Sequence, residues 1–287
     1  MEVQVSKGFL LFAQNTDTVD YVEQAYALAL SIKYSQQEVK SVSLVTNSKV
    51  PKKYREVFDQ IIPIPWFSKD KDSVLKGEHR WKMYEATPYE ETIVLDADML
   101  LVEDISIWWK YCSSYDIKFC SKIYNYKLDF IPFDKFHRKT FIANQLPNPY
   151  FALHYFKKNR PEYEFYKVLE FVCNNWEACY DIYAPDYYQK WLSMDLASAI
   201  ALEITGMHDQ AIDKCDPLNF IHMKTPLQDW PTGVDSWQDM VPYILNSKGE
   251  LIVGNIKQTK LFHYVEKNFV SKSLIARLEE LANATQA

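Results

Sequence analysis

The sequence predicts an α/β protein with an open, mainly parallel central sheet that is flanked by helices. Two observations lead to this fold class. Short apolar runs alternate with segments of helical periodicity over residues 8–100, and the apolar runs are of the kind that form buried parallel strands. The chain has 287 residues, 48% of them hydrophobic and 15% aromatic, which is enough for a sizeable core.

The elements of this first part follow one another in the order β-α-β-α-β-α-β. The expected strands are 8–13, 41–47, 61–65 and 92–100, and the expected helices are 21–35, 51–60 and 79–87. Apolar residues at helical spacing predict the first helix, and Pro51 suits the first turn of the second. The prolines of the third strand place it at a sheet edge, and Pro88 ends the third helix.

The rest of the chain is less regular. Residues 121–150 contain three prolines and many aromatic residues, so we expect long loops there, and residues 206–260 read as loops and short strands. Helices are expected over 161–178, 187–205 and 271–284, with Ser271 as the cap of the last one. Without a repeat or linker, the sequence predicts one domain, 1–287, with a ligand-binding half, 1–115, and a second half, 116–287.

Composition excludes several classes of protein. No run of 18 apolar residues is present, so no transmembrane helix is expected, and the first residues read as a strand instead of a signal peptide. The net charge of −6 and the pI of about 5.6 argue against nucleic acid or anionic lipid as a partner. The five cysteines form no C-x-x-C pair, which favours reduced thiols and a cytoplasmic location.

The acid pair Asp96 and Asp98 follows the apolar run of the fourth strand. Ligands of open parallel sheets bind beyond the carboxyl ends of the strands, and residues i and i+2 of a strand face the same side. Two neighbouring carboxylates repel each other unless a cation joins them, and their hard oxygen atoms suit Mg²⁺ or Mn²⁺. The alternative is the ordinary polar end of a strand.

Other ligand sites can be excluded from the sequence. A calcium loop of the EF-hand type that starts at Asp96 needs glycine at its sixth and glutamate at its twelfth position, where this chain has Leu101 and Ile107. The six glycines form neither a G-x-G-x-x-G motif nor a P-loop, and no H-E-x-x-H or G-x-S-x-G motif occurs.

The stretch RWKMYEATPYEETIVLDADMLLVEDIS resembles the core of the GT-A glycosyltransferases, above all family 8, the glycogenin and galactosyltransferase-like group. The resemblance implies a GT-A fold with a smaller acceptor-side lobe and a hexosyltransferase activity. It also implies that Asp96 and Asp98 hold Mn²⁺ (or Mg²⁺) against the diphosphate of a nucleotide sugar, with a UDP-sugar favoured. The basic residue that touches the donor sixteen positions before the first aspartate is then Arg80.

Further donor contacts are implied near the start of the chain. The segment YVEQAYALALSIK resembles the first helix of the family, whose leading tyrosine stacks on the base, and here that residue is Tyr21. The strand end FAQN would contact the nucleotide through Ala13, Gln14 and Asn15, and Ala97 of the acid motif would also lie against the donor.

Later segments supply the remaining implied site residues. SMDLASAIA suggests Asp195 as the acidic residue near the donor sugar and the acceptor, and LFHYVEKNF suggests His263 as third metal ligand and Lys267 as a diphosphate contact. The spacing departs from the family: the lysine follows the histidine by four residues instead of six, and the glycine and the Lys-Pro-Trp ending are missing. His222 is the rival third ligand.

Together these residues predict a metal-dependent glycosyltransferase that acts on a hydroxyl acceptor, and the resemblance implies retention of configuration. Two alternatives stay open: a sugar nucleotidyltransferase and a non-catalytic nucleotide-sugar-binding protein. The former usually has a glycine-rich, basic loop after the first strand, whereas this chain has AQNTDTVD. The sugar, the acceptor and the oligomeric state do not follow from the sequence.

Overall fold

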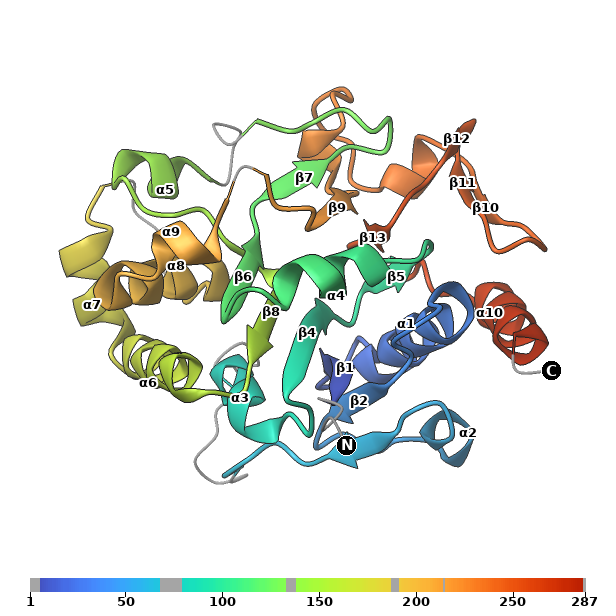
Figure 1. The fold of residues 1–287 in the computed structure, drawn as a ribbon. Coiled ribbons are helices and arrows are strands. Elements are labelled where there is room, and N and C mark those ends of the chain that lie inside the picture. The colour runs from blue at the N-terminus through green and yellow to red at the C-terminus, as the bar shows by residue number, and fades with distance from the viewer. Residues whose placement is uncertain (1–5, 68–78, 133–137, 187–190, 214, 286–287) are drawn as a thin grey trace.

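The computed structural model has the predicted α/β architecture and describes residues 6–67, 79–132, 138–186, 191–213 and 215–285. Its largest sheet has six strands in the order β3-β2-β1-β4-β8-β6 (Figure 1). These are β1 (Lys7–Phe12), β2 (Val42–Val45), β3 (Gln60–Ile62), β4 (Glu91–Asp96), β6 (Ile117–Cys120) and β8 (Tyr150–Lys157). Strands β3, β2, β1 and β4 are parallel, and β8 runs antiparallel to both β4 and β6. Strand β3 lies at an edge, as predicted, but it is shorter than the expected strand 61–65 and ends before Pro63.

A second sheet adjoins the first and has the order β5-β13-β9-β7. Its strands are β5 (Met99–Leu101), β7 (Lys122–Tyr124), β9 (Asn219–His222) and β13 (Leu261–His263). Strand β13 pairs antiparallel with β5 and parallel with β9. A third, antiparallel sheet is formed by β10 (Tyr243–Leu245), β11 (Leu251–Val253) and β12 (Ile256–Lys257). The second sheet matters most for function because it brings late parts of the chain to the end of β4.

Helices cover both faces of the six-stranded sheet (Figure 1). Phe9 and Leu11 of β1 pack in one core with α1 (Tyr21–Ser35) and α4 (Ser106–Cys112). Leu10 points into the other core, with α6 (Arg160–Asn174) and α8 (Met194–Thr205). A strand that is buried on both faces needs apolar residues at every position, which explains the unbroken apolar run of β1. The other helices are α2 (Lys52–Arg55), α3 (Met83–Ala86), α5 (Lys139–Ala143), α7 (Trp176–Tyr183), α9 (His208–Ala211) and α10 (Lys272–Ala284).

Capping side chains begin the two helices that pack together near the chain ends. The Asp20 carboxylate accepts a hydrogen bond from the backbone N–H of Glu23 at the start of α1, and Ser271 accepts one from Leu274 at the start of α10, as predicted. Tyr26 of α1 donates a hydrogen bond of 2.9 Å to Glu279 of α10. Within the described ranges, no helix combines the length and the apolar character needed to cross a membrane.

Several expected elements differ in the structure. The helix expected over 51–60 is a single turn, and that expected over 79–87 begins as the 3-10 turn Arg80–Lys82. The helix over 161–178 divides into α6 and α7, and that over 187–205 begins at Met194, with 187–190 outside the described residues. Strands β6 and β8 were not predicted. The strand over 92–100 divides into β4 and β5 because its two parts join different sheets.

Glu162 is a buried acid in α6 whose two carboxylate oxygens accept no hydrogen bond within the described residues. Burial, helped by the nearby Asp116, raises the pKa of Glu162 to about 9. The folded protein therefore keeps this side chain protonated at neutral pH, whereas the unfolded chain ionises it above about pH 4.5. Its contribution to stability is present below that pH and is lost as the pH rises toward 9.

We expect Glu162→Gln to raise the free energy of unfolding at pH 8 by roughly 2 kcal/mol, because glutamine has no proton to lose. At pH 5 the gain should be small. Urea denaturation at both pH values measures the difference. Glu164→Gln, on the exposed side of the same helix, is the control and should change little at either pH. Equal gains from Glu162→Gln at both pH values would show that the carboxyl is not buried in its neutral form.

Candidate active site

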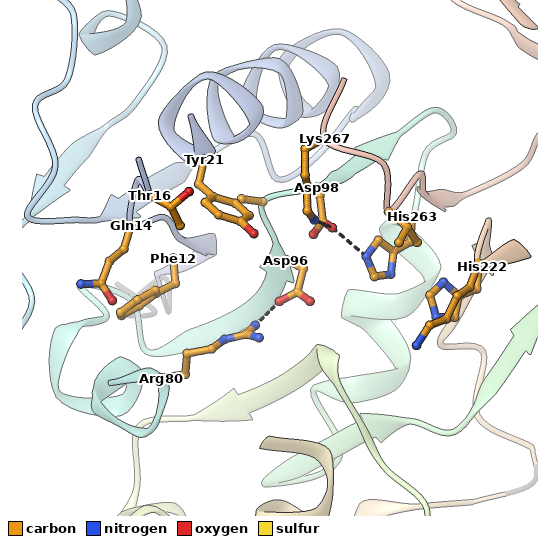
Figure 2. A pocket seen from close by; sticks show the side chains of 13 residues that line it. Phe12, Gln14, Thr16, Tyr21, Arg80, Asp96, Asp98, His222, His263 and Lys267 are labelled. Atoms are coloured by element: carbon orange, nitrogen blue, oxygen red, sulfur yellow. Dashed lines mark hydrogen bonds and ion pairs between the residues drawn. The ribbon is translucent and has the colours of Figure 1, made fainter. Parts of the chain in front are cut away.

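A cavity of about 440 Å³ opens beyond the carboxyl ends of β1 and β4 (Figure 2). This is where ligands bind in open α/β sheets. Its wall combines charged, imidazole and aromatic side chains from both halves of the chain. The lining residues are Phe12, Gln14, Thr16, Tyr21, Arg80, Asp96, Ala97, Asp98, His222, Lys224, His263, Val265 and Lys267.

The acid pair lies where the chain passes from the first sheet to the second. Asp96 is the last residue of β4, and Ala97 and Asp98 form the turn before β5. The two acids were expected to face one side of a continuous strand; that expectation is wrong, because the turn brings them together instead. Strand β5 pairs Met99 with His263 of β13, which places the imidazole Nε2 3.1 Å from Asp98 Oδ2.

Each acid also contacts a basic side chain (Figure 2). The Arg80 guanidinium forms an ion pair with Asp96, and the Lys267 ammonium forms one with Asp98. Burial alone would raise the pKa of Asp98, but His263 and Lys267 outweigh it and hold that pKa far below its usual range. Asp98 is therefore a carboxylate at any pH at which the protein would work.

The donor atoms fit a divalent metal ion. One ligand atom each from Asp96, Asp98 and His263 lies within 4.8 Å of the others. Two neighbouring ligands of an octahedral ion, each about 2.1 Å from the metal, are about 3 Å apart, which agrees with the 3.1 Å between His263 and Asp98. His222 stacks on His263 with ring centroids 4.7 Å apart and an interplanar angle of 5°, so the His263 ring is held in plane beside the acids.

The residues implied at the nucleotide end separate into two groups. Gln14 and Tyr21 line the cavity, and Lys267 lies 5.2 Å above the Tyr21 ring. Ala13 is buried in the core. The Asn15 side chain accepts a hydrogen bond from Val22 N at 2.9 Å, so it caps α1 and thereby places Tyr21, the first residue of that helix.

Asp195 lies on the first turn of α8 and lines a second, inner cavity of about 140 Å³. The inner cavity shares Arg80, Asp96, His222, Lys224 and His263 with the larger one, and Tyr150, Ala152, Asp195 and Phe220 complete its wall. The two cavities therefore meet at Asp96 and His263, whereas Asp98 lines only the larger one. A ligand that spans both would pass directly over Asp96.

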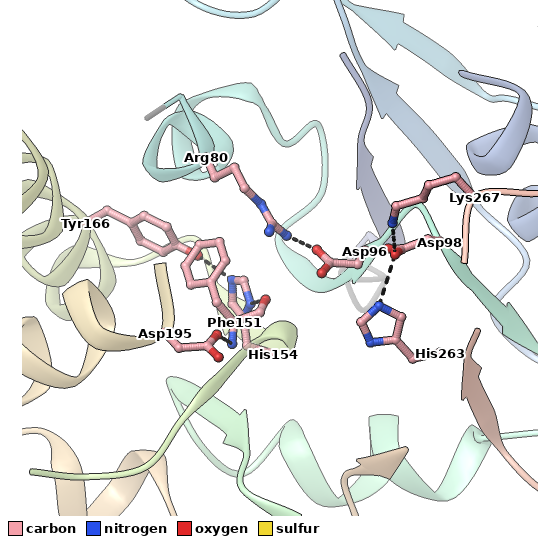
Figure 3. Close-up of polar contacts among 9 residues, drawn as sticks. All are labelled: Arg80, Asp96, Asp98, Phe151, His154, Tyr166, Asp195, His263 and Lys267. Atoms are coloured by element: carbon pink, nitrogen blue, oxygen red, sulfur yellow. Dashed lines mark hydrogen bonds and ion pairs between the residues drawn. The ribbon is translucent and has the colours of Figure 1, made fainter. Parts of the chain in front are cut away.

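Both carboxylate oxygens of Asp195 are held in place. Oδ1 accepts a hydrogen bond from the backbone N–H of Phe151 (Figure 3), and Oδ2 accepts one from Arg138 Nη2, each 2.8 Å long. The Phe151 carbonyl accepts from Nδ1 of His154, and Tyr166 donates to Nε2 of the same ring. Burial lowers the pKa of His154 to about 3, so this ring is neutral and supports the backbone that positions Asp195.

Lys224 lines the cavity but was not selected from the sequence, although its charged ammonium group can bind a ligand. It follows β9, at the carboxyl end of a strand parallel to β13. The same rule that drew attention to Asp96 would have selected Lys224, had 219–222 been recognised as a strand of a sheet.

No family model matches the sequence, and no curated protein matches it either. Among solved structures, an active-site mutant of LgtC matches with a TM-score of 0.52 and 12% identity, over 96% of this chain and 95% of that one. Mouse xyloside xylosyltransferase 1 in its apo form matches with a TM-score of 0.50 and 12% identity, over 91% of this chain and 98% of that one. These likenesses confirm the predicted GT-A fold.

The glycosyltransferase GlyE of Streptococcus pneumoniae TIGR4 also matches, with a TM-score of 0.41 and 8% identity. That match spans 71% of this chain and 44% of the other, so this chain corresponds to less than half of GlyE.

The metal-binding geometry can be tested by titration with Mn²⁺ alone, followed by the electron paramagnetic resonance signal of the free ion. We expect His263→Ala and Asp98→Asn each to weaken Mn²⁺ binding more than about tenfold, since even partners one step removed from a metal contribute about that much. Asp181→Asn, an exposed acid of α7, is the control. An equal loss from His222→Ala with no loss from His263→Ala would make His222 the third ligand.

Proposed function

We propose that the protein is a metal-dependent glycosyltransferase that moves a sugar from a nucleotide sugar, with UDP as the favoured nucleotide, to a hydroxyl acceptor. The observation that carries this proposal is the cluster of Asp96, Asp98 and His263 between two cations, Arg80 and Lys267. The cluster lies at the end of β4 beside the large cavity, which supports the proposal.

The charges of the cluster suit a diphosphate. The two carboxylates and the two basic side chains cancel one another. A divalent ion held by Asp96, Asp98 and His263 would make the cluster doubly positive, which matches the two negative charges of a nucleoside diphosphate sugar. Arg80 and Lys267 could then donate charge-assisted hydrogen bonds to phosphate oxygens.

The nucleotide end of the cavity suits a pyrimidine base. The Tyr21 ring offers a face for stacking. The Gln14 side chain lines the same region, and its Oε1 atom is buried without a hydrogen-bond partner within the described residues. A free amide oxygen beside an aromatic face can accept a hydrogen bond from the N–H group of uracil, which supports UDP. Ala97, in the turn between Asp96 and Asp98, lines the same cavity and is proposed to lie against the donor.

In the proposed reaction the bond between the anomeric carbon and the phosphate oxygen breaks, and its electron pair leaves with the diphosphate. The metal ion would supply Lewis-acid stabilisation of that negative charge. Arg80 and Lys267 stabilise the same charge through their fixed positions. The sugar passes through an oxocarbenium-like state. The acceptor oxygen forms the new bond to the anomeric carbon as its hydroxyl proton passes to the departing diphosphate, and retention of configuration is part of the proposal.

Asp195 is proposed to position the sugar in the inner cavity. Arg138 and the Phe151 backbone already hold its two oxygens, but each carboxylate oxygen has a second lone pair that can accept a hydrogen bond from a sugar hydroxyl. The contact would orient the anomeric carbon toward the acceptor.

The five cysteines are free thiols, which supports a cytoplasmic location as part of the proposal.

Turnover distinguishes the proposal from its two alternatives. With UDP-, GDP-, CMP- and ADP-sugars as substrates, we expect release of UDP that requires Mn²⁺ or Mg²⁺ and stops with a chelator. Asp98→Asn should lower the rate by about 100-fold or more, because the metal contributes several kcal/mol to the transition state. Asp181→Asn serves again as control.

Binding of the donor without metal-dependent release would instead identify a binding protein. Release of pyrophosphate from a nucleoside triphosphate and a sugar phosphate would identify a nucleotidyltransferase. Proton NMR of the first product gives its anomeric configuration, and an inverted product would contradict retention.

Asp195→Asn should lower kcat by roughly 100-fold while the affinity for UDP stays the same, because small displacements of the sugar cost that much. The asparagine amide cannot accept from both Arg138 and the Phe151 N–H, so the side chain must move. Steady-state kinetics and UDP titration measure the two quantities. A parallel loss of UDP affinity would show that Asp195 supports the whole site instead of the sugar.

A further inference from the structure

Lys224 is a cation to which the proposed binding of the nucleotide sugar assigns no role. It lies in the segment after β9 and lines both the large cavity and the inner cavity. Within the part of the chain that the structure describes, its ammonium group forms no ion pair and no hydrogen bond. The other cations of the two cavities, Arg80 and Lys267, are paired with the acid motif.

The inner cavity consequently carries a surplus positive charge. Arg80 is balanced by Asp96, and the Asp195 carboxylate is balanced by its ion pair with the buried Arg138. Lys224 is the group left over. Burial lowers the pKa of Lys224, Arg138 lowers it further, and Asp195 raises it in part. Half-burying an ammonium group without an anionic partner costs free energy. A ligand anion beside it would offset that free energy.

The position of Lys224 relates it to the sugar end of the ligand. Gln14 lies at one end of the large cavity, and Tyr21 lies between it and the acid pair. Asp96 lines both cavities, and the inner cavity continues from there to Asp195. A nucleotide sugar that binds in this order would put its diphosphate at the acid pair and its sugar in the inner cavity. Tyr150, Ala152 and Phe220 give that cavity apolar walls, which suit the carbon face of a sugar ring.

We infer that Lys224 binds a carboxylate on the sugar that occupies the inner cavity, so that one substrate of the protein is an acidic sugar of the hexuronic type. This inference rests on the proposed function. A carboxylate carries a single negative charge, which matches the single surplus charge, whereas a phosphate monoester would bring nearly two. The carboxylate can belong to the transferred sugar or to the acceptor sugar.

Calorimetric titration in the presence of Mn²⁺ tests the inference with three ligands: UDP, UDP-glucose and UDP-glucuronic acid. If the transferred sugar is acidic, UDP-glucuronic acid should bind about tenfold or more tightly than UDP-glucose. Lys224→Gln should remove this preference and leave the affinity for UDP unchanged. Lys224→Arg, which keeps the charge, should retain most of it, and Lys248→Gln, an exposed lysine of the 246–250 turn, should retain all of it.

A second titration, of the protein saturated with UDP and Mn²⁺, compares methyl glucuronide with methyl glucoside. A preference for the glucuronide that depends on Lys224 would assign the carboxylate to the acceptor. No preference in either titration would overturn the inference while UDP binding still supported the proposed function. An equal loss of UDP affinity in Lys224→Gln would overturn it as well, since the lysine would then serve the diphosphate. Failure of UDP itself to bind would contradict both the proposed function and the inference about Lys224.

Discussion

The turn at Ala97 and Asp98 is the feature on which the site depends. It takes the chain out of the six-stranded sheet and into the four-stranded one. Because β4 lies beside β1, the turn faces the start of α1 and its Tyr21. Because β5 pairs with β13, the same turn faces His263. The two sheets thus adjoin at the turn that carries the two carboxylates. The elements that contact this turn supply the other site residues.

Like charges at such a junction must be neutralised, and the fold does this from both directions along the chain. Arg80 comes from the 3-10 turn that precedes β4, and Lys267 comes from the segment after β13. Both basic groups contact the acids across the cavity and line it. The basic groups that pair with the acids are therefore also placed to bind an entering phosphate. The same side chains would thus neutralise the acids in the absence of a ligand and bind the anion in its presence.

Local patterns predicted a large part of this arrangement. Helical spacing predicted α1 with the bounds that the structure has, and Ser271 predicted the start of α10. The apolar runs predicted β1, β2 and β4. Tyr21, Arg80 and His263 were implied by the family resemblance instead, and they line one cavity with the acid pair. Strand β8 was missed because its antiparallel place beside β4 is set by long-range pairing, and its run YFALHYFK has no alternation. Lys224 was missed for a related reason, since the three strands that place it are short and distant in sequence.

The hydrogen bond between Asp98 and His263 joins residues 165 positions apart. Contacts of such high sequence separation form late and slowly in folding, since a long loop must close first. During synthesis the acid pair leaves the ribosome long before β13 does, and until β13 docks it lacks its imidazole partner. A ligand that bridges the two sheets would bind only the fully assembled chain and would stabilise it in proportion to the logarithm of its concentration. The substrate would then stabilise the protein only after the last strand of the site, β13, has docked.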